Sequence, residues 1–485
     1  MRLQGRLTRL SLPRSLSGTE WWGSRLCPAM YFVNHLLLLR SLLLAAFTAV
    51  TCAASAASRP NVLVIVADDL GWAGVGFHNK AMVTPHLDKL AKEGAELQRF
   101  YVYPTCSPTR VALLTGQMPR RYNVISALQG AEPGMPAGVP TIASVFKSAG
   151  YRTSLIGKWH VGQATQPQSA GFDHYYGFLT SEIDYYQHTG KGGRLDWQRD
   201  GKPLQEEGYS TYLFADEAVK QISSRDPMKP FYLQVSLNSP HVPLSAPPEL
   251  VKKHPGANGL YTAVVESMDI GIGRILAALD EAKIRDDTLV LFFSDNGASG
   301  REGGSNAPFS GGKFGLSEGG IHTPALIRWP GKIPAGAVLT QPVCVQDVFP
   351  TLAAAAEVPL PRDTKLDGSS QLPAIAQSKR MERPPFLIAT SDIALIDGDW
   401  KVVEWSTGTL SLFNLAKDPA ETNDLYGAEA SRARALTAKL DELKKDLPAV
   451  TAQRAGPPGP GKGGPGMGKG KGKGGPMRPG QRPKP

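Results

Sequence analysis

Cysteine is scarce in this sequence, which has four in 485 residues. Cys27 and Cys52 lie in a leader that we predict to be removed, so Cys106 and Cys344 are the two expected in the mature chain. Two cysteines are too few to stabilise an exported fold by disulfide cross-links, and a disulfide scaffold is therefore excluded. A nonstructural use for one of the two becomes more plausible.

The sequence also lacks an apolar run that suits a membrane-spanning helix. The leucine-rich run within residues 31–58 is interrupted by Arg40 and is followed by small residues, as in a secretory signal. We therefore expect export to a periplasmic or extracellular compartment, with cleavage near Ala56–Ser58. Met30 could be the true start of the chain. Cys52 leaves a lipoprotein open, although the residues before it fit a lipobox poorly.

Excess positive charge is missing from the central part of the chain. The net charge is +10, but residues 1–58 carry +5 and residues 454–485 carry +8, which leaves −3 for residues 59–453. The central part is therefore not a basic nucleic-acid binder, and we expect no nucleic-acid partner. Residues 454–485 combine Gly, Pro and Lys without an acidic residue. They predict a disordered tail that either contacts polyanions or serves only as a solubilising segment.

Apolar strands and amphipathic helices alternate along residues 59–364. Continuous apolar runs predict strands, and apolar residues at helical spacing predict helices. The predicted strands are residues 61–67, 97–102, 152–156, 231–237 and 288–294, and the predicted helices are residues 84–94, 141–149, 210–224 and 261–283. The alternation predicts an α/β fold with a large mixed, mostly parallel sheet flanked by helices.

The pattern changes near residue 365. Residues 397–405 and 411–415 predict a hairpin, and residues 427–446 predict a helix. We therefore expect a large catalytic domain at residues 59–364 and a smaller C-terminal sheet-and-helix subdomain at residues 365–453.

Polar side chains follow four of the predicted strands. These side chains are Asp68 and Asp69, Lys158 and His160, His241, and Asp295 and Asn296. Open α/β sheets bind ligands beyond the carboxyl ends of their strands, so we expect the four strand ends to build one site. Lys158 and His160 flank Trp159, so in an extended chain they face the same side.

Cys106 begins the most distinctive stretch of the sequence, Cys106-Ser107-Pro108-Thr109-Arg110, which continues to Leu114-Thr115-Gly116. Pro108 in a first turn and Gly116 as a stop predict a short helix with Cys106 at its mouth. The free amides of that helix end, together with Arg110, favour an anion. The alternative is an inert buried thiol, which is the ordinary state of a lone cysteine.

This stretch resembles the sulfatase signature, Cys-x-Pro-Ser-Arg followed by x-x-x-Leu-Thr-Gly, with Thr109 where Ser is usual. The resemblance extends from about Arg59 to about Leu425 and includes Gly157-Lys158-Trp159-His160 and Gly311-Gly312-Lys313. It implies the alkaline-phosphatase-like fold. It also implies that a formylglycine-generating enzyme oxidises Cys106 to formylglycine (3-oxoalanine), whose hydrate is the nucleophile.

Asp68, Asp69, Asp295 and Asn296 offer only oxygen atoms, the ligands that calcium prefers, although such residues are often just solvated loop ends or turns. The resemblance implies that one calcium ion is held by Asp68, Asp69, Cys106, Asp295 and Asn296. It implies catalytic roles for Cys106, Arg110, Lys158, His160, His241 and Lys313. Of these residues, Lys158, His241 and Lys313 are implied to bind the sulfate group.

We therefore expect an exported sulfatase that hydrolyses sulfate monoesters, with a sulfated carbohydrate or an aryl sulfate as substrate. A phosphonate monoester or phosphodiester hydrolase of the same fold is the alternative enzyme. An inactive polyanion-binding protein is a more remote alternative, and the presence of every expected metal and sulfate position argues against it.

Overall fold

The computed structural model describes residues 59–362 and 364–450. The expected export segment at residues 1–58, with Met30, Cys52 and the cleavage site, lies outside the described residues. So does the expected disordered tail at residues 454–485. Along the described residues, no helix combines the length and the hydrophobicity that crossing a bilayer requires.

The central element is a large sheet, to which ten strands of the described chain belong, in the order β11-β2-β10-β9-β1-β8-β4-β5-β6-β7. Strands β9, β1, β8, β4 and β5 are mutually parallel and form the middle of the sheet, whereas β10 and β6 run antiparallel to their neighbours. Its strands are β1 (Asn61–Ala67), β2 (Ala95–Leu97), β4 (Arg152–Lys158), β5 (His174–Phe178), β6 (Gln198–Arg199), β7 (Lys202–Pro203), β8 (Phe231–Ser236), β9 (Thr288–Ser294), β10 (Ala325–Arg328) and β11 (Ala337–Leu339). The prediction of a mixed, mostly parallel α/β sheet is confirmed.

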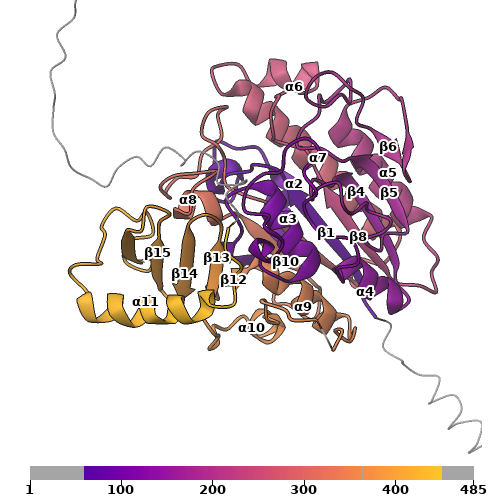
Figure 1. Cartoon of the computed structure of the whole chain (residues 1–485). Helices are drawn as coiled ribbons and strands as arrows, with labels where there is room; N and C mark the ends of the chain where they lie inside the picture. Colours follow the sequence, from indigo (N-terminus) through magenta and orange to yellow (C-terminus); the bar gives the residue numbers. More distant parts are fainter. Residues whose placement is uncertain (1–58, 363, 451–485) are drawn as a thin grey trace, which may run out of the picture. The chain divides into compact units, whose positions relative to one another are not determined.

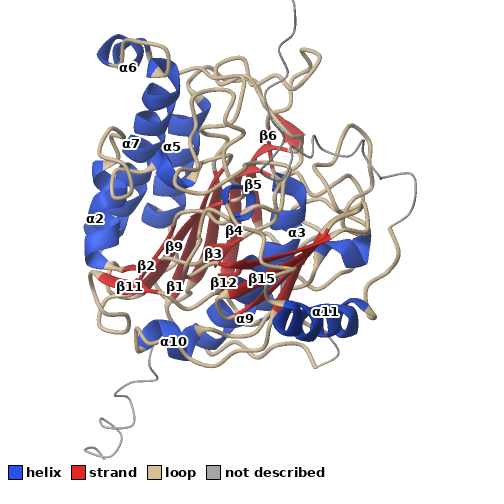
Figure 2. Cartoon of the chain, turned by 90° about the vertical axis from the view of Figure 1, so that its left-hand side faces the viewer, coloured by secondary structure: helices blue, strands red, loops and turns tan. Residues whose placement is uncertain are grey.

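Helices cover both faces of this sheet (Figure 1, Figure 2). Successive side chains of a strand point to opposite faces, and in β1 they enter two separate cores, with Val62 and Val64 in one and Leu63 and Ile65 in the other. The first core includes side chains of α3 (Cys106–Thr115), α4 (Ile142–Ser148) and α9 (Val345–Ala355). The second includes side chains of α2 (Pro85–Glu93), α5 (Ser210–Ser223) and α7 (Gly259–Glu281). Burial on both faces explains why β1 reads as a continuous apolar run.

The predicted strand at residues 97–102 is two short strands instead. β2 ends at Leu97, and β3 (Phe100–Tyr101) pairs with β12 (Val343–Cys344) in a separate two-stranded sheet. Gln98 and Arg99 form the turn between them, so the chain changes sheets just before it reaches Cys106. Shorter helices complete this part: η1 (Trp72–Gly74), η2 (Pro119–Tyr122), α6 (Pro248–Lys253), α8 (Glu318–Ile321) and α10 (Leu372–Ala376).

The C-terminal part is a small antiparallel sheet covered by one helix, as predicted. The order of its strands is β13 (Phe386–Ala389), β14 (Ile393–Asp397), β15 (Trp400–Glu404) and β16 (Leu410–Asn414), and its helix is α11 (Ala430–Lys444). Leu387 and Leu395 pack with Leu436 and Leu440 of α11. The alternate side chains, such as Ile388, belong to the core of the large sheet. The small sheet is therefore sandwiched between α11 and the main body, while the expected boundary at residues 364/365 stays a prediction.

The packing of α11 predicts a difference between two leucines of one helix. Leu440 is fully buried, whereas Leu443 is 38% exposed. Leu440→Ala should lower the free energy of unfolding by about 2–5 kcal/mol, because it leaves a cavity against the small sheet. Leu443→Ala, the matched control, should change it by less than about 1 kcal/mol. Urea unfolding followed by circular dichroism measures both, and equal losses would contradict this account of the packing.

Candidate active site

Four adjacent parallel strands bring the predicted site residues to one edge of the sheet. Asp68 and Asp69 directly follow β1, Lys158 ends β4, and Asp295 directly follows β9. Strand β8, whose following loop carries His241, lies between β1 and β4. The carboxyl ends of these strands share one edge, so residues more than 200 positions apart in sequence become neighbours.

Helix α3 presents Cys106 to the same edge. Cys106 is the first residue of the helix, Pro108 lies in its first turn, and Gly116 ends it in the left-handed conformation with φ of 65°. Every residue of α3 is buried, so the helix is a fixed part of the core. The predicted short helix with a cysteine at its mouth is confirmed.

Buried ion pairs join the site residues at this edge of the sheet into one cluster. Lys158 Nζ donates to Asp68 Oδ2 at 2.6 Å, and Lys313 Nζ donates to Asp69 Oδ2 at 2.7 Å. Arg110 Nε and Nη2 both donate to Asp295 Oδ2, at 3.0 and 2.7 Å. Three carboxylates are thus matched by three cations, which is the condition under which such charges can be buried.

The cluster has a deep end and an outer end. The side chains of Asp68, Lys158 and Asp295 are 0% exposed, whereas that of Asp69 is 11% exposed. The side chain of Lys313, which pairs with Asp69, is 7% exposed. A ligand from solvent therefore meets Asp69 and Lys313 first.

His160 faces the thiol of Cys106. Its Nδ1 lies 3.2 Å from Cys106 Sγ, and its Nε2 donates to the carbonyl oxygen of Leu128 at 2.9 Å. Because a carbonyl only accepts, Nε2 carries the proton and Nδ1 of the neutral ring accepts from residue 106. Burial, together with the positive charge of Lys158, lowers the pKa of His160 well below its usual value, so the ring is neutral at pH 7.

The backbone at His160 differs from the extended conformation expected for residues 158–160. Strand β4 ends at Lys158, and φ of His160 is 48°, in the left-handed region. Both side chains still reach the cluster, Lys158 at Asp68 and His160 at Cys106. The left-handed backbone of His160, rather than strand alternation, sets the direction of its side chain.

His241 stands at the outer end of the cluster. Its Nε2 lies 3.7 Å from Asp69 Oδ2, and its Nδ1 donates to the carbonyl oxygen of Val242 at 2.6 Å. The buried hydroxyl of Tyr185 donates to the carbonyl oxygen of His241 at 2.9 Å and so fixes the backbone there. Tyr185 is a support that the sequence did not reveal, because it lies in a segment without a recognisable pattern.

Two electrostatic effects set the protonation states of Cys106 and Lys313. Burial raises the pKa of the Cys106 thiol, so the unmodified side chain stays protonated. For Lys313, burial opposes the charged form, but the nearby carboxylate of Asp69 outweighs it and raises the pKa above its usual value. The ammonium group of Lys313 is therefore positively charged at neutral pH.

The cluster fits a hard divalent cation. Asp68 Oδ1 and Asn296 Oδ1 are buried and have no hydrogen-bond partner within the described part of the chain. Ligand atoms of Asp68, Cys106 and Asp295 lie within 4.8 Å of one another, and so do those of Asp68, Asp69 and His241. Orphaned buried oxygens cost free energy unless something occupies their lone pairs, and a set of carboxylate and amide oxygens suits calcium.

The loop that carries Lys313 is braced by the C-terminal sheet. Lys401 of β15 is fully buried, and its Nζ lies 2.6 Å from the carbonyl oxygen of Leu316, 3.0 Å from Glu318 Oε1 and 2.7 Å from Glu421 Oε1. The backbone N–H of Glu318 donates to Glu421 Oε2 at 2.6 Å. Lys401 and Glu421 thus support the site from outside it. His322 also contacts Glu318, with Nδ1 2.9 Å from Oε2.

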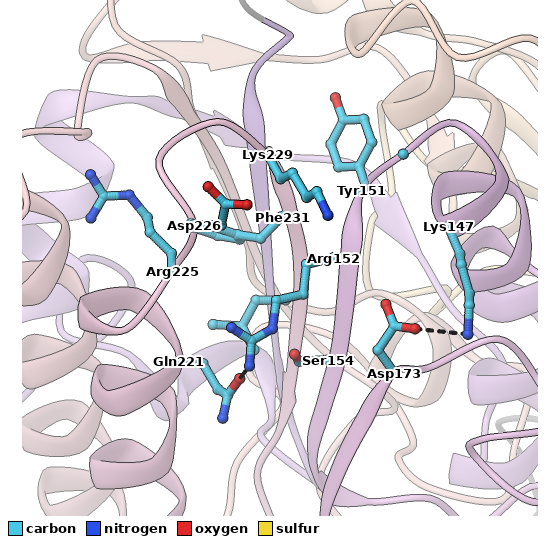
Figure 3. A pocket seen from close by; sticks show the side chains of 12 residues that line it. Lys147, Tyr151, Arg152, Ser154, Asp173, Gln221, Arg225, Asp226, Lys229 and Phe231 are labelled. Atoms are coloured by element: carbon cyan, nitrogen blue, oxygen red, sulfur yellow. Dashed lines mark hydrogen bonds and ion pairs between the residues drawn. The ribbon is translucent and has the colours of Figure 1, made fainter.

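A cavity of about 470 Å³ lies at the opposite end of the parallel strands (Figure 3). Its lining includes Arg152 and Phe231, the first residues of β4 and β8. Lys147 pairs there with Asp173 at 2.7 Å, and none of the cluster residues lines it. This cavity is therefore separate from the candidate active site.

Comparisons with known proteins agree with the geometry. The sulfatase family model matches residues 60–358, and the model described as N-sulphoglucosamine sulphohydrolase, C-terminal, matches residues 313–448. Human N-acetylgalactosamine-6-sulfatase is 34% identical over 362 residues, which is 69% of each chain.

Two solved structures are informative about the fold. The crystal structure of Ps i-CgsB in complex with k-i-k-neocarrahexaose has a TM-score of 0.75 and 30% identity, covering 81% of this chain and 94% of that one. The phosphonate monoester hydrolase of Agrobacterium radiobacter has a TM-score of 0.58 and 21% identity, covering 80% of this chain and 95% of that one. The second likeness extends to the fold alone.

The buried ion pairs around Glu318, which support the loop that carries Lys313, predict a pH-dependent contribution to stability. Burial alone would raise the pKa of Glu318, but Lys401 and His322 outweigh it and lower the pKa to about 2, from 4.5 for an ordinary glutamate. Between these values the unfolded chain binds the proton more tightly, so the stabilisation from Glu318 is complete above pH 4.5 and is lost as pH falls toward 2. The charged or titratable groups facing Glu318 are Lys401, Glu421, His322, Tyr101 and Arg99.

Glu318→Gln should therefore lower the free energy of unfolding by about 3 kcal/mol at pH 6, since it removes one of the two carboxylates that compensate the buried Lys401. Urea unfolding from pH 6 to pH 3.5 should show the gap to the unmodified chain shrinking below pH 4.5. Glu249→Gln, at an exposed helix position, is the control and should show no such gap. A gap independent of pH would contradict the assignment.

Proposed function

Because this chain belongs to the sulfatase family of sulfuric ester hydrolases, we propose that it hydrolyses sulfate monoesters of carbohydrates, using formylglycine made from Cys106 and one calcium ion. The observation that carries the proposal is the position of Cys106. It begins α3, faces Nδ1 of His160 at 3.2 Å, and lies within 4.8 Å of carboxylate oxygens of Asp68 and Asp295.

Conversion of Cys106 to formylglycine needs a separate modifying enzyme, which the proposal includes as a maturation partner. The hydrate of a formylglycine at residue 106 would carry two hydroxyls on one carbon, one to serve as the nucleophile and the other to give up a proton. His160 is oriented to take a proton from residue 106, because its Nε2–H is committed to Leu128 and its Nδ1 is free to accept.

The cations hold the anionic end of the substrate. Lys158 and Lys313 carry their ammonium groups at the deep and outer ends of the cluster, and Arg110 is fixed by two hydrogen bonds to Asp295. Preorganised positive charge of this kind stabilises the charge that develops on sulfuryl oxygens in the transition state. His241 or Lys313, at the outer end, is placed to protonate the leaving sugar oxygen.

Asp68, Asp69, Asp295 and Asn296, with residue 106, are the residues that would hold the calcium ion. When bound, the ion supplies Lewis-acid polarisation of the sulfate oxygens and of the nucleophile. It also makes the cluster net positive, since the three carboxylates and three cations cancel without it. A net positive pocket suits a sulfate ester better than a neutral one does.

Two relatives support a carbohydrate as the substrate. One is named N-acetylgalactosamine-6-sulfatase, and the other was crystallised with an oligosaccharide, k-i-k-neocarrahexaose. We further propose export after cleavage of the leader at residues 1–58, from its apolar run and small residues. Residues 454–485 could add contact with polyanions through their positive charge.

Substitution of Cys106 tests the proposal directly. Cys106→Ala should lower kcat on sulfated monosaccharides by about 10⁴-fold or more, because the nucleophile is lost. Cys344→Ala, which changes the second buried free cysteine of the described residues, is the control and should stay active. Mass spectrometry of the peptide containing residue 106 should show the aldehyde in active protein. A fully active protein with an unmodified thiol would refute the mechanism, and a strong preference for phosphonate or phosphodiester substrates would favour the alternative enzyme.

Calcium binding has a readout independent of turnover. Calcium at about 100 times its dissociation constant should stabilise the protein by about 2.7 kcal/mol. Asp68→Asn, which keeps the shape of the side chain but removes its charge, should abolish the shift of Tm. Asp173→Asn, whose carboxylate pairs with Lys147 away from the cluster, is the control and should keep it. Equal calcium-induced shifts in both variants would contradict the assigned ligands.

A further inference from the structure

Phe314 immediately follows Lys313 and is exposed. It is 62% exposed, whereas the side chain of Lys313 is 7% exposed and reaches Asp69. The Lys313 ammonium nitrogen lies 5.5 Å from the centre of the Phe314 ring. A large apolar surface thus stands next to the cation at the outer end of the active site. A single exposed aromatic residue is ordinary by itself, so a function for Phe314 is inferred from its backbone and its surroundings.

The backbone of Phe314 is in a conformation that favours glycine. Its φ is 80°, and the N–H of Gly315 donates to the carbonyl oxygen of Gly312 at 3.1 Å. This is a type II turn with Lys313 second and Phe314 third, and the third position normally takes Gly or Asn. A phenylalanine there is strained, and its exposed ring gains little from burial in return. Stability therefore explains neither the residue type nor its exposure.

The turn is held rigidly. The N–H groups of Lys313 and Phe314 donate to the carbonyl oxygens of Ala298 and Pro104, at 3.1 and 2.8 Å. Pro104 lies two residues before Cys106, so the same hydrogen bond ties the ring to the nucleophile segment. Lys401 holds the far side of the loop through the carbonyl oxygen of Leu316. The ring is therefore presented to solvent at a fixed distance from the sulfate-binding lysine.

We propose that Phe314 is a specificity-determining residue, whose ring stacks against the apolar face of the sugar that carries the sulfate ester. This inference rests on the proposed function. Sugar rings bury their C–H faces on aromatic side chains, and a rigid platform loses little conformational entropy on binding. The strained turn places Lys313 inward on the sulfate and Phe314 outward on the ring that bears it.

The test uses the maturated full chain and two substitutions at Phe314. Phe314→Gly removes the ring and suits the turn, so Tm should not fall. KM should rise at least fivefold on the best substrate among the 6-sulfates of galactose, N-acetylgalactosamine and glucosamine, with a smaller change in kcat. Phe314→Trp keeps a platform, so its KM should stay within about threefold of the unsubstituted value. Its fluorescence should change when the desulfated sugar is added.

Inorganic sulfate separates stacking from a structural effect, because it occupies the sulfate pocket without a ring. Its inhibition constant should change less than twofold in Phe314→Gly. Lys283→Gly, which relieves a left-handed residue with φ of 54° at the end of α7, is the control and should leave KM unchanged. An unchanged KM in Phe314→Gly overturns the inference, and so does a parallel rise of KM and of the sulfate inhibition constant. If none of the sugar sulfates is hydrolysed and a phosphonate ester is turned over instead, the proposed function is overturned. The proposal that a sugar stacks on Phe314 is then overturned as well.

Discussion

Mutual neutralisation of buried charges at the carboxyl edge of the sheet is the constraint on which this structure depends. Asp68, Asp69 and Asp295 could not be buried alone, since an unpaired buried charge costs several kcal/mol. Their partners, Arg110, Lys158 and Lys313, come from α3, β4 and a loop near residue 313. The pairs form only when all these segments are in place, so the fold and the site depend on each other.

Much of this arrangement could be predicted from the sequence. The strands at residues 61–67 and 288–294 are continuous apolar runs because both faces of the sheet are covered, and that burial is visible in the composition. The convergence of Asp68 and Asp295 follows from parallel neighbours alone. The roles expected for Lys158, His160 and Lys313 came from the resemblance to the sulfatase family rather than from spacing. The structure places each of these side chains in the cluster.

What the sequence did not reveal depends on tertiary contacts. Lys401 lies between Trp400 and Val402 and reads as the solvent face of a strand, yet its ammonium group is fully buried between two carboxylates. The partner of His160 Nε2 is a backbone carbonyl, that of Leu128, which no side-chain pattern marks. The left-handed conformation of Phe314 belongs to a turn whose N–H groups donate to the distant carbonyl oxygens of Ala298 and Pro104.

The buried pair between Lys401 and Glu318 has a consequence for how the chain can be divided. The small C-terminal sheet has its own core against α11, which suggests a separable module. A fragment that ended before β13 would nevertheless remove Lys401 from Glu318 and expose the apolar side chains that Ile388 and its neighbours cover. The N-terminal part therefore contains every residue of the candidate site but depends on the C-terminal part for its stability. Recombination between relatives within this family should keep the two halves of that ion pair together.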